Sequence, residues 1–222
     1  MLIIAIPKSA STSLMKTLGD LHKIPAKQTF FPDQIKPKPY SYLWKCHSDI
    51  REITDEQAGL FSDRNQIFKQ HVPPTDNNRK LLYDIKKVIL LRPANEVVSA
   101  YFRGAQKRVH NVLPDFNGIT TQEEFLKKAE INGLLDDLQH FYDTWQEDTG
   151  NKLIISYEDL IQSPVDTIQK IEKYWEWSLS DCNVRLAKER YSRISSTRVV
   201  WNQFFTRPKK KLLSLIKHLI RS

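Results

Sequence analysis

The first fourteen residues, MLIIAIPKSASTSL, join a short apolar run to a segment rich in hydroxyl side chains. The run from Leu2 to Ile6 has the length and the β-branched content of a buried strand. The segment after it combines one ammonium group with hydroxyl donors and comprises Lys8, Ser9, Ala10, Ser11, Thr12 and Ser13. A loop that passes from a strand into a helix also offers free backbone N–H groups at the positive end of the helix dipole. The stretch therefore predicts an anion-binding cradle, with serines that only cap the helix as the alternative.

Short apolar runs of the same kind occur further along the chain, at residues 66–69, 88–91 and 153–155. Between them lie segments whose apolar residues recur at helical spacing, at residues 13–21 and 96–109. Strands that alternate with helices and are apolar throughout predict an α/β fold, with a central parallel sheet flanked by helices. In such folds ligands bind beyond the carboxyl ends of the strands.

The composition of the chain excludes several classes of protein. Its 222 residues suit one domain, and a hydrophobic content of 40% is ordinary for a globular protein. The formal net charge is +8, but residues 207–222 carry six basic and no acidic side chains, so the remainder carries only about +2. This distribution argues against nucleic acid as a partner. Cys46 and Cys182 make no disulfide framework, and no Cys/His spacing matches a zinc site. Without a signal peptide or a membrane-spanning apolar run, we expect a soluble, cytoplasmic protein.

A second candidate anion site follows the apolar run at residues 88–91. Arg92 comes directly after this run, and Ser99 lies about one turn into the next expected helix. Arginine binds phosphate through paired N–H donors and serine through its hydroxyl group. The pair predicts a site for a second phosphate, with an arginine that is paired within the structure as the alternative.

Four segments carry a resemblance to one known family: PKSASTSL at residues 7–14, RPANEVVSAY at 92–101, LIISYEDLIQSPVDTIQKIEKYW at 153–175 and TRVVWNQFFT at 197–206. In this order they resemble the 5′-phosphosulfate loop, the 3′-phosphate segment, a strand with its following helix, and a late segment of the PAPS-dependent sulfotransferases. The resemblance implies a P-loop-like sulfotransferase fold over residues 1–206, with 3′-phosphoadenylyl sulfate (PAPS) as donor. It also implies transfer of a sulfuryl group to a hydroxyl or amine of a small-molecule or glycan acceptor, without a metal ion.

The resemblance implies roles for the first loop. Lys8 would neutralise the phosphate oxygen that leaves, and residues 9–13 would hold the 5′-phosphate. Ala10 stands where the family usually has glycine, so we expect the loop to manage without a left-handed conformation there.

It implies roles for later residues as well. Arg92 and Ser99 would hold the 3′-phosphate, although the residue that the family usually has between Arg92 and Pro93 is missing. Tyr157 would lie near the adenine, with a position in the core as the alternative. Arg198, or Arg193 in its place, would add a late phosphate contact.

The acceptor must lose a proton, and the family commonly uses a histidine upstream of the 3′-phosphate segment. Two candidates exist, His47 in WKCH and His71 in FKQHVPP. We favour His71 because it follows a run of strand length, where catalytic groups belong, and because its separation from Arg92 is close to that of the family. Lys69 would support it as a cation. A neutral imidazole can accept a proton near pH 7.

The last residues, 207–222, form a basic segment with apolar residues at helical spacing. They predict an amphipathic helix of the same domain that packs on its own fold, with weak contact to a membrane surface as the alternative.

Two other functions fit part of the pattern. A P-loop kinase or other NTPase would share the strand-loop-helix phosphate site, but the chain lacks the G-K-S or G-K-T sequence of such a loop. A non-catalytic nucleotide-binding adaptor would show loss of Lys8 or of both histidines, and the chain keeps all three.

Overall fold

The computed structural model describes residues 1–28, 35–47, 49–107, 113 and 115–177. Several predictions lie outside the described residues: those for Cys182, Arg193, Arg198, the segment at 197–206 and the helix at 207–222. Within the described part, no helix is both long enough and apolar enough to cross a lipid bilayer.

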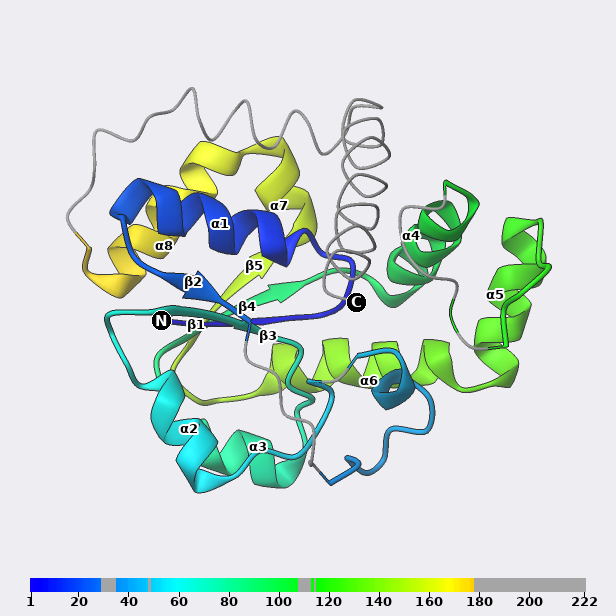
Figure 1. The fold of residues 1–222 in the computed structure, drawn as a ribbon, viewed down its shortest axis with the longest axis horizontal. Coiled ribbons are helices and arrows are strands. Elements are labelled where there is room, and N and C mark those ends of the chain that lie inside the picture. Colours follow the sequence, from blue (N-terminus) through cyan, green and yellow to red (C-terminus); the bar gives the residue numbers. More distant parts are fainter. Residues whose placement is uncertain (29–34, 48, 108–112, 114, 178–222) are drawn as a thin grey trace, which may run out of the picture.

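Five parallel strands form one sheet at the centre of the molecule (Figure 1). They are β1 (Leu2–Ala5), β2 (Ala26–Lys27), β3 (Ile67–Gln70), β4 (Lys87–Leu91) and β5 (Lys152–Ser156). Their order across the sheet is β2-β3-β1-β4-β5, so that β1 lies in the middle. This confirms the predicted α/β fold with a central parallel sheet. The four predicted strands correspond to β1, β3, β4 and β5, whereas β2 was not predicted because it has only two residues.

Helices cover both faces of the sheet (Figure 1). On one face lie α1 (Ser11–His22), α7 (Tyr157–Gln162) and α8 (Pro164–Trp175). The other face and its edge carry α2 (Asp55–Phe61), α3 (Asp76–Leu81), α4 (Ala94–Gln106), α5 (Gln122–Ile131) and α6 (Leu134–Glu147), together with the short 3₁₀ helix η1 (Leu43–Lys45).

The central strand β1 contributes side chains to both halves of the core. Ile3 and Ala5 pack in the cluster on the α1 face, while Leu2 and Ile4 pack in the cluster on the opposite face. Because successive side chains of a strand point to opposite faces, a strand buried on both sides must be apolar at every position. This explains why β1 is a continuous apolar run.

The register of the sheet brings three loops to one edge. Strand β1 pairs in parallel with β3 on one side and with β4 on the other. Their carboxyl ends are followed by the loop of Lys8, by His71 and by Arg92, respectively. The two candidate anion sites and the favoured candidate base therefore come from three neighbouring strands.

Candidate active site

The loop between β1 and α1 is shaped by its backbone and by one buried hydroxyl group. Lys8 and Ala10 have φ angles of 62° and 64°, in the left-handed region. Ser9 is buried, and its hydroxyl group donates a hydrogen bond to Ile6 O at 2.7 Å. The Ser9 side chain therefore stabilises the turn from within.

The expectation that the loop avoids a left-handed conformation at Ala10 is wrong. Ala10 occupies the N-cap position of α1 in that conformation, and its carbonyl accepts hydrogen bonds from the N–H groups of Ser13 and Leu14. Because Ala10 occupies the N-cap position, the serine and threonine side chains of the loop do not cap α1. Ser11 and Thr12 lie in the first helical turn, where backbone N–H groups have no acceptor within the helix. This leaves donors at the positive end of α1 for an anion.

Ala10→Gly should stabilise the fold, because a left-handed conformation costs an L-residue about 1 to 2 kcal/mol and costs glycine almost nothing. We expect a gain of about 1 kcal/mol, or about 2 to 4 °C in Tm for a domain of this size, by thermal unfolding. As a matched control, Ala100→Gly within α4 should instead destabilise by about 0.5 to 1 kcal/mol. Equal losses in both variants would contradict a strained Ala10.

Arg92 joins the two candidate anion sites. It is 7% exposed, and its Nη1 donates to Lys8 O at 2.8 Å. Its Nε donates to the Glu96 carboxylate at 3.1 Å, and its guanidinium group lies 3.8 Å from the centre of the Tyr157 ring. These two hydrogen bonds use two of the five N–H donors of the guanidinium group. Arg92 is thus paired within the structure and still carries donors suited to a phosphate.

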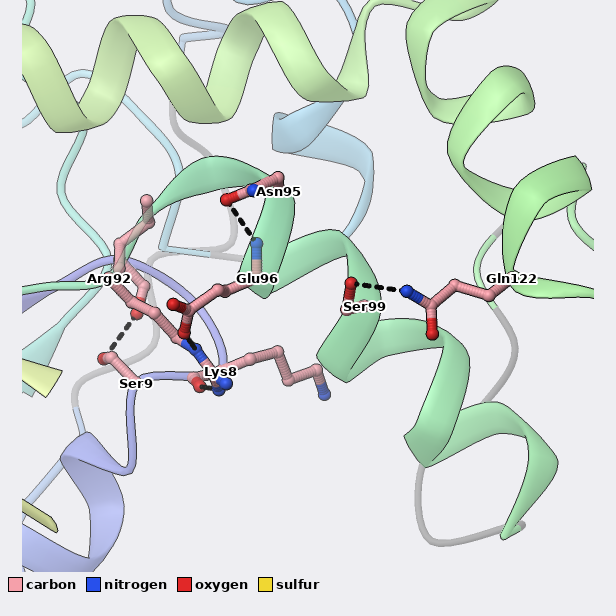
Figure 2. Close-up of polar contacts among 8 residues, drawn as sticks. Lys8, Ser9, Arg92, Asn95, Glu96, Ser99 and Gln122 are labelled. Atoms are coloured by element: carbon pink, nitrogen blue, oxygen red, sulfur yellow. Dashed lines mark hydrogen bonds and ion pairs between the residues drawn. The ribbon is translucent and has the colours of Figure 1, made fainter. Parts of the chain in front are cut away.

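Ser99 lies in α4, further along the chain than Arg92 and Glu96 (Figure 2). The Ser99 hydroxyl group accepts a hydrogen bond from Gln122 Nε2 at 3.2 Å. Figure 2 shows the Lys8 side chain extending away from Arg92 toward α4, and its Nζ lies 4.8 Å from the centre of the Tyr101 ring. The structure therefore brings Lys8 and Arg92 into contact at the first loop, whereas the Ser99 hydroxyl group contacts Gln122 at the start of α5.

Lys8 is largely withdrawn from water. Burial lowers its pKa to about 8, with Cys46 opposing this shift and Lys69 adding to it. At pH 7 most of the Lys8 population is still charged. An ammonium group in such surroundings interacts more strongly with an anion than it would in water.

His71 is the centre of a buried hydrogen-bond network directly after β3. It is 5% exposed, and its Nδ1 donates to Ala5 O at 2.6 Å, which leaves Nε2 as an acceptor. Lys69 Nζ donates to this Nε2 at 2.8 Å, and Asp49 accepts the backbone N–H of His71 at 2.6 Å. Burial and the Lys69 charge hold the pKa of His71 well below its usual 6.5. The imidazole is therefore neutral at pH 7, as a proton acceptor must be.

His47, the other candidate base, lies in the same cluster. The centres of the His47 and His71 rings are 4.7 Å apart, and His47 Nε2 lies 2.6 Å from the Tyr101 hydroxyl group. In the described part of the chain, ligand atoms of His47, Asp49 and His71 all lie within 4.8 Å of one another. Because the Lys69 ammonium group already supplies a cation at His71 Nε2, we assign no metal ion to this cluster.

Three residues of this region were not predicted from the sequence. Tyr101 lies in the segment RPANEVVSAY, which pointed to its neighbourhood but not to its contacts with His47 and Lys8. Cys46 stands in the candidate segment WKCH, which pointed to His47 and not to the cysteine. Asp49 stands just after it, and no sequence signal would have identified it.

Comparison with known proteins agrees with this architecture. A sequence-family model described as the sulfotransferase domain matches residues 1–211. No curated protein sequence matches the chain. Among solved structures, a mouse sulfotransferase complexed with PAP shares 15% identity and a TM-score of 0.57, over 86% of this chain and 63% of its own. A sulfotransferase from Alicyclobacillus acidocaldarius shares 14% identity and a TM-score of 0.53, over 81% of each chain.

These two structures have the same fold as this chain. The chain spans somewhat less than two thirds of the mouse protein. The family model extends from residue 1, just before β1, to beyond α8 and includes all three loops at the carboxyl edge of the sheet. The chain therefore belongs to the sulfotransferase domain family.

Proposed function

We propose that this protein transfers a sulfuryl group from PAPS to a hydroxyl or amine of a small-molecule or glycan acceptor. The observation that carries the proposal is the hydrogen bond between Arg92 and Lys8 O, which joins two anion-binding loops at neighbouring strand ends. PAPS carries phosphate at both the 5′ and the 3′ position, so it needs two such loops side by side. The PAP bound to the mouse sulfotransferase is a bisphosphate of this type.

The residues divide the work between binding and chemistry. The backbone N–H groups at the start of α1 and the hydroxyls of residues 11–13 bind the 5′-phosphate, and Arg92 with Ser99 binds the 3′-phosphate. PAPS supplies the sulfuryl group, whose bond to a phosphate oxygen breaks as the acceptor oxygen or nitrogen bonds to sulfur. Lys8 stabilises the charge that develops on that phosphate oxygen, and His71 accepts the acceptor's proton. Tyr157 lies against Arg92 and would flank the nucleotide.

Equilibrium binding of nucleotides tests this function against the kinase alternative. We expect 3′,5′-ADP to bind more tightly than ADP or ATP, with no dependence on Mg²⁺. A preference for ATP that requires Mg²⁺ would instead indicate an NTPase. A protein that binds 3′,5′-ADP tightly but transfers no sulfuryl group to any of a broad set of alcohols, glycans and amines would be an adaptor.

Arg92→Ala should weaken the binding of 3′,5′-ADP by about 1.5 to 3 kcal/mol, the range of a hydrogen bond to a charged group. Binding of 5′-AMP, which lacks the 3′-phosphate, should change far less. Calorimetry with both ligands measures the difference.

The matched control is Glu96→Gln, which removes the carboxylate that pairs with Arg92 and keeps the guanidinium group. This variant should bind 3′,5′-ADP at least as tightly as the wild type, because a nearby negative charge is lost. Equal losses for both ligands in Arg92→Ala would show that Arg92 only holds the loop.

A further inference from the structure

Asp49 is a buried carboxylate with no role in the function proposed above. It is 1% exposed and lies in the segment between η1 and α2. One oxygen, Oδ2, accepts the backbone N–H of His71 at 2.6 Å and the Gln28 amide at 3.2 Å. The other, Oδ1, is buried and has no hydrogen-bond partner among the residues that the structure describes. A buried carboxylate oxygen without a hydrogen bond destabilises the fold. Its position beside the candidate base suggests a role in the reaction.

The groups around Asp49 are mostly cations or groups that become cations. They are Lys69 and His71 from β3 and its end, His47 and Arg51 from its own segment, and the neutral Tyr101. The Lys8 ammonium group, from the loop after β1, acts on His47 and His71. Burial lowers the pKa of both Lys69 and His47, and the negative charge of Asp49 opposes this in each case. Among these described groups Asp49 is the one carboxylate.

We propose that Asp49 is a positioning residue for the sulfotransfer: it fixes the main chain of His71 and offsets the charge that His71 gains with the acceptor's proton. This rests on the proposed function. The acceptor's proton replaces the Lys69 hydrogen bond at His71 Nε2. Without Asp49, this transfer would form a third cation beside two ammonium groups in a buried site. With Asp49, the same transfer places the new imidazolium near a carboxylate that has an oxygen without a hydrogen bond. In a Ser-His-Asp triad a buried carboxylate also stabilises an imidazolium, but there it bonds the ring, whereas Asp49 bonds the His71 backbone.

Asp49→Asn tests the charge separately from the hydrogen bond. The Asn side chain keeps an oxygen that can accept the His71 N–H but carries no charge. We expect kcat to fall by about 10- to 100-fold while the KM for PAPS changes by less than about twofold. The acidic limb of the pH–rate profile should move to lower pH, because loss of a nearby negative charge lowers the pKa of an imidazole.

Asp137→Asn is the matched control. Asp137 is also a buried carboxylate and accepts the backbone N–H groups of Tyr42 and Leu43, both at 2.7 Å, so it holds η1 against α6. Its substitution should lower Tm and leave the acidic limb in place. A fall in Asp49→Asn activity that follows Tm, with the acidic limb unmoved, would overturn the proposal, and so would a wild-type rate.

A second measurement does not depend on sulfotransfer. NMR titration should show the His47 and Lys69 resonances of Asp49→Asn changing at lower pH than in the wild type. Unchanged titrations would refute the electrostatic role of Asp49 even in an active enzyme. Shifted titrations in a chain that transfers no sulfuryl group would support that role and reject the proposed function instead.

Discussion

Lys8→Ala should lower kcat by about 10² or more while the affinity for 3′,5′-ADP falls far less. In the proposed function, Lys8 neutralises charge that appears on the bridging phosphate oxygen only as its bond to sulfur breaks. In the same proposal the first turn of α1 and residues 11–13 hold the phosphate in the ground state, so we expect binding to survive without the ammonium group. Single-turnover kinetics together with calorimetry separate the two effects.

The pKa of Lys8 adds a test of the same role. Only the charged form can neutralise an oxygen, so kcat/KM should fall as pH rises through about 8, the pKa of Lys8 without ligand. The negative charge of the bound donor raises this pKa, so kcat should fall only at higher pH.

The control for Lys8 is Lys16→Ala, which removes an exposed lysine of α1 and should leave both parameters unchanged. A Lys8→Ala enzyme with a nearly normal kcat and only a raised KM for PAPS would assign Lys8 to binding alone.

The sheet could be predicted because its long strands are buried on both faces. Each of β1, β3, β4 and β5 left a visible apolar run, and each of the three loops at the site begins where such a run ends. The apolar runs do not encode the order of the strands across the sheet. The bond between Arg92 and Lys8 O exists because β1 pairs with β4, although 84 positions separate the two residues.

The cluster around His71 could be predicted only in part, for a related reason. Lys69 lies in β3 and His71 directly follows it, so the sequence alone predicted that Lys69 supports His71. Asp49 reaches the His71 backbone from a loop 22 positions earlier, and a single acidic residue in a loop has no distinctive pattern. The backbone of Ala10 was mispredicted because residue type suggests a conformation that the surrounding turn then overrides.

His71→Ala should lower kcat by about 10² to 10⁴ through loss of the general base. The structure specifies the pH dependence of the wild type. A base is inactive when protonated, and burial with the Lys69 charge holds the pKa of His71 well below 6.5. The wild-type rate should therefore persist below pH 6.5 and fall only as pH passes through that lowered pKa. The His71→Ala profile should lack this acidic limb.

His47 provides the decisive comparison, because it lies in the same cluster and has a pKa lowered by the same burial. Its ring contacts the Tyr101 hydroxyl group, whereas His71 is held by Ala5 O, with Nε2 directed to Lys69. His47→Ala should cost less than about tenfold and keep the acidic limb. His71→Asn serves as a second variant of the base that leaves a smaller cavity, and it should be as slow as His71→Ala. If His47→Ala is instead the slower enzyme and loses the limb, His47 is the base and His71 supports the cluster through Lys69.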